Sequence, residues 1–131
     1  MAERNDVLQA RINAKIEEIK RDYGNGICDL LKELNRTRLK GKGKITPLPI
    51  EERNSLCWML AWKQDREISF ELSIVVNVED DGRQARVGRV WVHRHASTPL
   101  DYDGHTPTTR MRRLAALSIA GIRDAIEAEW S

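Results

Sequence analysis

Residues 67–95 read EISFELSIVVNVEDDGRQARVGRVWVHRH, and this stretch predicts one long β-hairpin. In its first half an apolar residue stands at every second position, the period that places side chains on one face of a strand: Ile68, Phe70, Leu72, Ile74, Val76 and Val78. The sequence Asp80-Asp81-Gly82 is typical of a tight turn. The returning half alternates until Gly88, where the pattern slips by one residue and predicts a β-bulge. Its inward-facing residues are Ala85, Val87, Val90 and Val92.

Length and composition indicate a single globular domain. The chain has 131 residues, of which 40% are hydrophobic and 32% charged. Because the net charge is only +2, attraction to nucleic acid or membranes must come from local clusters. The two cysteines, Cys28 and Cys57, match no metal or redox spacing. With no signal-peptide pattern and no apolar run longer than Leu56 to Trp62, we expect a cytoplasmic protein with no membrane partner.

The N-terminal segment carries apolar residues at spacings of three and four, which predict a helix from Asn5 or Asp6 to about Tyr23. Gly24-Asn25-Gly26 follows, and an apolar stripe of nearly the same phase resumes from Ile27 to about Leu39. Two alternatives remain open, a helical hairpin and one long helix bent at the glycines. We expect the stripe to pack in the core, with a homodimer seam as the alternative.

Residues 36–49 open with five cations and no acid: Arg36, Arg38, Lys40, Lys42 and Lys44. Like charges around glycines do not pack together, and prolines at positions 47 and 49 favour extended backbone. We therefore expect a basic flexible linker between the N-terminal helices and the sheet.

Residues 51–63 fit both a helix and a strand. Pro49 followed by two glutamates indicates a short helical turn, whereas the alternation of Leu56, Trp58, Leu60 and Trp62 predicts a strand from about Ser55 to Trp62. Cys57, Met59 and Ala61 fill the intervening positions. A strand that is apolar on both faces is usually covered on both. We expect helices on both faces of the sheet, or a second chain on one of them.

The C-terminal segment predicts a loop from His95 to Thr108 and then a helix, capped by Thr108 or Thr109, to about Glu129. The expected fold is thus one α+β domain of residues 1–131. It contains an N-terminal helix or helical hairpin, a three-stranded antiparallel meander and a C-terminal helix packed on the sheet.

The outward face of the hairpin is the first candidate site. Side chains that alternate with the buried valines combine cations with an indole, and Val75 accompanies them on the neighbouring strand: Arg86, Arg89, Trp91 and His93. Tryptophan and arginine are the residues that anchor protein–protein contacts. A purely structural explanation pairs the arginines with Glu71 or Glu79 across the strands.

A second candidate combines histidines with carboxylates that could hold a metal ion: His93, His95, His105, Asp101 and Asp103. The sequence His95-Ala96-Ser97 resembles the His-x-Ser/Thr signature of the two-histidine phosphoesterases, and no second copy follows. That resemblance implies phosphodiester chemistry at these histidines. A metal-dependent phosphodiesterase is the distant alternative. Because no nucleophile elbow or phosphate-binding glycine loop is present, we predict no catalytic residue, no cofactor and no enzyme.

A third candidate would bind nucleic acid through the five linker cations together with Arg110, Arg112 and Arg113. The predicted order of helix, three strands and helix, with Ala115-Ala116 after the arginines, resembles the double-stranded RNA-binding domain. The paired lysines of that family fall on Thr108 and Thr109 here, and Arg112 occupies the place of a third. The resemblance implies recognition of duplex RNA.

The leading prediction is a small, non-enzymatic binding or regulatory protein. It would dock onto a protein partner, or onto a second copy of itself, through the outward sheet face. Phage-type inhibitors, immunity proteins and secretion chaperones are proteins of this kind. Nucleic-acid binding is the alternative.

Overall fold

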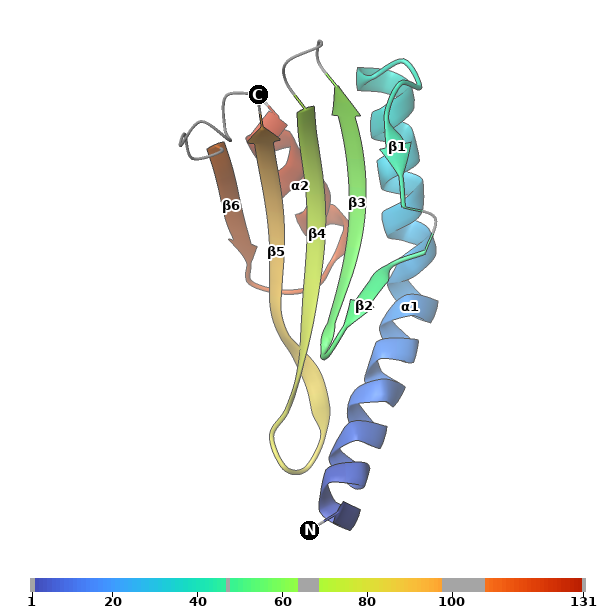
Figure 1. The fold of residues 1–131 in the computed structure, drawn as a ribbon, viewed down its shortest axis with the longest axis vertical. Helices are drawn as coiled ribbons and strands as arrows, with labels where there is room; N and C mark the ends of the chain where they lie inside the picture. Colours follow the sequence, from blue (N-terminus) through green and yellow to red (C-terminus); the bar gives the residue numbers. More distant parts are fainter. Residues whose placement is uncertain (1, 47, 64–68, 98–107, 131) are drawn as a thin grey trace.

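Two helices cover one face of a six-stranded antiparallel sheet (Figure 1). The computed structural model describes residues 2–46, 48–63, 69–97 and 108–130. The elements follow the chain as α1 (Ala2–Arg38), β1 (Lys44–Ile45), β2 (Ile50–Glu52), β3 (Ser55–Lys63), β4 (Ser69–Asp80), β5 (Ala85–Ser97), β6 (Thr108–Leu114) and α2 (Ile119–Trp130). The α+β class agrees with the sequence prediction. The strand number does not, because three strands were expected.

The predicted meander forms the middle of the sheet, and the unexpected strands lie at its edges. The strand order is β1-β3-β4-β5-β6, and β2 also pairs with β3. Both β1 and β2 therefore lie along the same edge of β3, β1 beside residues 60–61 and β2 beside residues 55–57. At the other edge β6 pairs with β5.

The long hairpin of β4 and β5 is confirmed in its turn and in its bulge. Gly82 has a φ of 93°, and the N–H of Asp81 donates to the carbonyl of Gln84 at 3.1 Å. Asn77 pairs with Arg89, whereas Val78 pairs with residue 87, so Gly88 is the extra residue. A Cβ at Gly88 would lie 2.3 Å from the side chain of Glu79, so a larger residue at the bulge would require that side chain to move.

The core lies between the helices and the face of the sheet that carries the alternating apolar residues of β3, β4 and β5. These side chains are at most 1% exposed: Leu56, Trp58, Leu60, Leu72, Ile74, Val76, Val78, Val90 and Val92. The apolar stripes of both helices pack against them: Ile12, Ile16, Ile19, Ile27, Leu30, Leu31, Leu34, Ile122, Ala125 and Ile126. The side chains at every second position of the strands thus pack in one layer against the side chains at spacings of three and four in the helices.

The N-terminal segment is one continuous helix, so the helical hairpin is excluded. The helix also begins before Asn5 and Asp6, which lie inside it and do not cap it. Gly26 allows a close approach by α2, because a Cβ there would lie 3.0 Å from Cδ1 of Ile119. The helix persists through two glycines because its apolar stripe remains buried on both sides of them.

Residues 36–49 divide between two elements and the turns beside them. Arg36 and Arg38 belong to the last turn of α1, and Lys44 opens β1. Between them, Lys40 and Gly41 have φ values of 53° and 80°. The side chain of Asn35 accepts from the N–H of Gly43 at 2.7 Å and donates to its carbonyl at 3.1 Å. The end of α1 is thereby tied to the start of the sheet.

Two other boundaries differ from the sequence prediction. Residues 50–52 form the strand β2 and not a helical turn. Residues 108–114 form the strand β6, and the final helix begins only at Ile119. Its N-cap is Ser118, whose hydroxyl accepts from the N–H of Gly121 at 3.0 Å, rather than Thr108 or Thr109.

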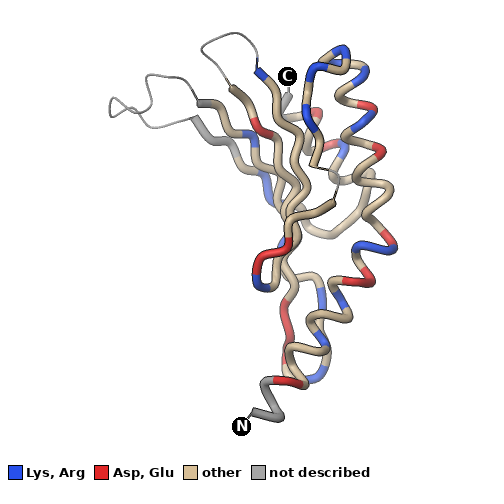
Figure 2. Tube along the Cα trace, turned by 45° about the vertical axis from the view of Figure 1, so that its right-hand side comes forward, with Lys and Arg blue, Asp and Glu red and all other residues tan. Residues whose placement is uncertain are grey.

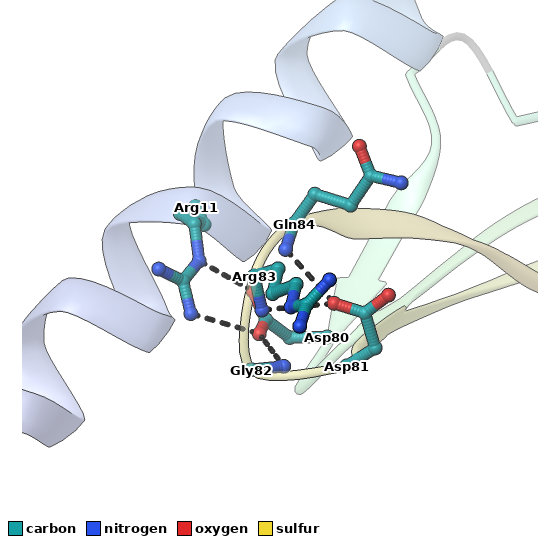
Figure 3. Close-up of polar contacts among 6 residues, drawn as sticks. All are labelled: Arg11, Asp80, Asp81, Gly82, Arg83 and Gln84. Carbon is teal, nitrogen blue, oxygen red and sulfur yellow. Dashed lines mark hydrogen bonds and ion pairs between the residues drawn. The ribbon is translucent and has the colours of Figure 1, made fainter.

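Ion pairs connect the helices to the hairpin and to each other. Arg11 of α1 donates two hydrogen bonds, at 2.8 and 2.9 Å, to Asp80, which lies at the hairpin turn (Figure 3). Arg123 of α2 pairs with Glu33 of α1 at 2.9 Å, and Arg38 of α1 pairs with Glu127 of α2. Within the described residues, neither helix combines the length and apolar character that a bilayer crossing requires.

Candidate protein-docking face

The face of the sheet that points away from α1 and α2 is here called the open face. One row of residues crosses it in register over five strands, since each is the Cα partner of the next: Ile50, Cys57, Val75, Trp91 and Arg113. Neighbouring strands lie about 4.8 Å apart, so this central row spans roughly 19 Å. Four of its five members are apolar. No described helix covers it.

A second row runs beside the central row and consists of Met59, Ser73, His93 and Met111. Most side chains of the two rows are half-buried, because neighbours on the same face cover them partly. The outermost apolar ones are more accessible, with Ile50 48% and Met111 55% exposed. The open face therefore presents contiguous apolar groups without a covering layer within the described chain, a property typical of interaction surfaces.

Trp91 lies near the middle of β5 and is held by contacts on its own face. The guanidinium carbon of Arg113 lies 5.8 Å from the centre of its ring. The ring of His93 meets it edge-on, with 6.2 Å between centroids and 81° between planes. Partial burial lowers the pKa of His93, so this imidazole is neutral at pH 7. An indole held between a cation and a neutral ring loses little conformational freedom when a partner binds.

A hollow of about 480 Å³ lies at the β2 end of the central row. Ile50, Cys57 and Val75 provide its apolar part, and Arg53 and Asn77 provide polar groups. Arg53 holds a positive φ of 54° in the turn that joins β2 to β3. Burial raises the pKa of the Cys57 thiol, which therefore stays protonated. The hollow suits an apolar side chain of a partner better than it suits nucleophilic chemistry.

The register places all five residues of the predicted interface on the open face: Val75, Arg86, Arg89, Trp91 and His93. In the strand register, Arg86 lies opposite Glu79 and Arg89 lies opposite Asn77, close to the bulge. Sequence reasoning did not place Ile50, Met111 or Arg113 on this face, because it assigned residues 50 and 110–113 to helical segments. Arg113 was predicted there as a nucleic-acid contact. Cys57 and Met59 carried a usable signal, since they alternate with the buried residues of β3.

The two predicted cationic clusters do not form one surface. The cluster of residues 36–44 surrounds the end of α1 and β1, at one edge of the sheet (Figure 2). Arg110, Arg112 and Arg113 lie on β6, at the opposite edge, and not at the start of a helix. Arg38 is moreover paired with Glu127 of α2. The helix N-terminus that was expected to support phosphate binding at these arginines is absent there.

The predicted metal site is only partly within the described residues. His93 and His95 occupy alternate positions of β5 and thus share the open face, as expected. Asp101, Asp103 and His105 lie outside the described residues. Among the residues that the structure describes, no group of three or more His, Cys, Asp or Glu side chains could hold a metal ion.

The fold and the open face together define an α+β protein with a one-sided helical cover. Comparison of the chain with protein-family models, with curated proteins and with solved structures gave no match.

Proposed function

We propose that the protein is a non-enzymatic binding protein that docks a protein partner on its open face. The observation that carries this proposal is the strand β3, which is apolar on both of its faces. Leu56, Trp58 and Leu60 are fully buried under the helices. Cys57, Met59 and Ala61 alternate with them on the open face, where no described element covers them. Strands of this composition are normally covered on both sides, so a partner supplies the second layer.

Two features of the open face support docking of a protein rather than of a small molecule. The central row extends over five strands and carries apolar residues on four of them, as a surface that contacts a protein does. Trp91 and Arg113 near one end and the hollow at Ile50 near the other provide anchor points of the kind that dominate interface energetics.

The test is affinity capture from native lysate, with and without nuclease treatment, with wild-type protein, Val75→Glu and Trp91→Ala as baits. Lys32→Ala, at an exposed position of α1, is the matched control. We expect the wild type and the control to retain the same protein, and both open-face variants to lose it although circular dichroism shows them folded. Equal retention by all four baits would overturn the proposal. Retention that disappears with nuclease would favour nucleic-acid binding instead.

A further inference from the structure

The two edges of the sheet differ in the length of strand that they present. One edge is formed by the short strands β1 and β2, of two and three residues, whereas at the other edge β6 pairs with β5 and with no other described strand. The outer side of β6 thus presents backbone N–H and C=O groups over seven residues, Thr108–Leu114. Such an edge is a template for an added strand, unless charge or shape prevents pairing.

The β6 edge of the sheet is also cationic. Neither β5 nor β6 contains Asp or Glu, and together they contain Arg86, Arg89, Arg94, Arg110, Arg112 and Arg113. On β6 itself, Arg112 pairs with Val92 and so lies on the helix-covered face. Arg113 pairs with Trp91 and lies on the open face. An added strand would therefore meet an arginine on both faces of the sheet.

This charge pattern decides between two occupants of the edge. Antiparallel pairing of β6 with β6 of a second copy would place arginines of both copies opposite or diagonal to one another. Like charges at such positions destabilise strand pairing. An extended segment that carries Asp or Glu at neighbouring positions would instead form cross-strand ion pairs with both arginines.

We propose that β6 binds an extended acidic segment of the partner by strand addition, with carboxylates beside Arg112 and Arg113. The proposal rests on the proposed docking function and names the chemistry of the partner. The added strand would extend the central row beyond Arg113, because its alternate side chains would point to the open face. Backbone hydrogen bonds then provide affinity, and the two arginines select for acidic residues.

The test uses as its probe a capped peptide with two adjacent Glu residues flanked by Val on both sides, here called the Glu–Val peptide. The control is the same peptide with Lys in place of Glu, the Lys–Val peptide. We expect the Glu–Val peptide to bind, with slower exchange of alternate β6 amide protons in NMR spectra and with weaker binding at high salt. The Lys–Val peptide should not bind. Absence of Glu–Val binding at millimolar concentration, or equal binding of both peptides, would overturn the proposal and leave the arginines as protection against edge pairing.

A charge reversal provides the second measurement. The double variant Arg112→Glu and Arg113→Glu should lose affinity for the Glu–Val peptide by roughly tenfold or more and gain affinity for the Lys–Val peptide. Arg113→Glu alone should shift both affinities in the same directions if the double variant does not fold. If the double variant still prefers the Glu–Val peptide, strand addition by acidic segments is overturned. A homodimer that prevents peptide binding and that persists in the double variant would overturn it as well. Capture that depends on Val75 and Trp91 would then still stand, so failure of this inference is distinguishable from failure of the proposed function.

Discussion

Gly24 and Gly26 are two residues apart in the middle of α1, and a methyl group would meet different surroundings at each. At Gly24 no atom lies within 4 Å of the added Cβ, whereas at Gly26 Cδ1 of Ile119 lies at 3.0 Å. A glycine inside a helix costs about 0.5–1 kcal/mol relative to alanine. Gly24→Ala should therefore raise the free energy of unfolding by about that amount. Gly26→Ala should gain less or lose stability, because Ile119 must move. Urea unfolding measures both, and equal gains would contradict the close packing of α2 on α1.

Trp58 presents a second residue-scale test, because it is fully buried and its indole N–H has no hydrogen-bond partner among the described residues. Trp58→Ala should cost about 3–5 kcal/mol of unfolding free energy through the cavity it leaves. Trp58→Phe should cost much less, since it removes an unsatisfied donor whose burial costs about 1–3 kcal/mol. Denaturant midpoints compare the two variants. Similar losses would indicate that the indole N–H is satisfied in solution.

At the scale of elements, the ion pair between Arg11 and Asp80 connects α1 to the hairpin turn and should make stability depend on pH. The hydrogen bond from Arg11 lowers the pKa of Asp80 below its usual value. A carboxylate whose pKa is lower in the folded state stabilises the fold above its unfolded pKa of about 3.9. That stabilisation is lost as the pH falls through the lower pKa of the folded state.

Asp80→Asn should therefore be less stable than the wild type at pH 7, and the difference should shrink below about pH 4. Thermal unfolding between pH 7 and pH 2 measures it. Arg11→Ala is the matched control: combined with Asp80→Asn, it should add little further loss, because the pair is already broken. Full additivity of the two losses would contradict the ion pair.

The elements that sequence reasoning found are those whose pattern is local and strong. The alternation of β3, β4 and β5 and the slip at Gly88 were sufficient for the meander and its bulge. The strand β6 was missed because Met111, Leu114, Ser118 and Ile122 continue at helical spacing across a real boundary. In the structure Ser118 caps the helix, so only the part of this apolar pattern that follows Ser118 is helical. The strand β2 was missed because Pro49 and two glutamates are typical of a helix start, and pairing with β3 overrides that preference.

At the scale of the whole molecule, placing two helices on one side of the sheet accounts for both the core and the open face. The composition of β3 predicted that both of its faces are covered. Within the described chain, the two helices cover one of these faces. Val75 and Trp91 could be predicted from the hairpin alone. The central row could not, because its ends at Ile50 and Arg113 depend on the pairing of β2 with β3 and of β6 with β5. Neither pairing was expected, because the segments of β2 and β6 were assigned to helical structure.

Val75 and Val76 allow the most direct test of this two-sided arrangement. They are adjacent valines of β4 that point to opposite faces, Val76 being fully buried and Val75 half-buried on the open face. The measurement is urea unfolding of Val75→Glu and Val76→Glu. We expect Val75→Glu to fold with a loss of about 1 kcal/mol or less. Val76→Glu should be unfolded, because it buries an unpaired charge. Equal destabilisation by the two substitutions would contradict the open face and the docking function with it.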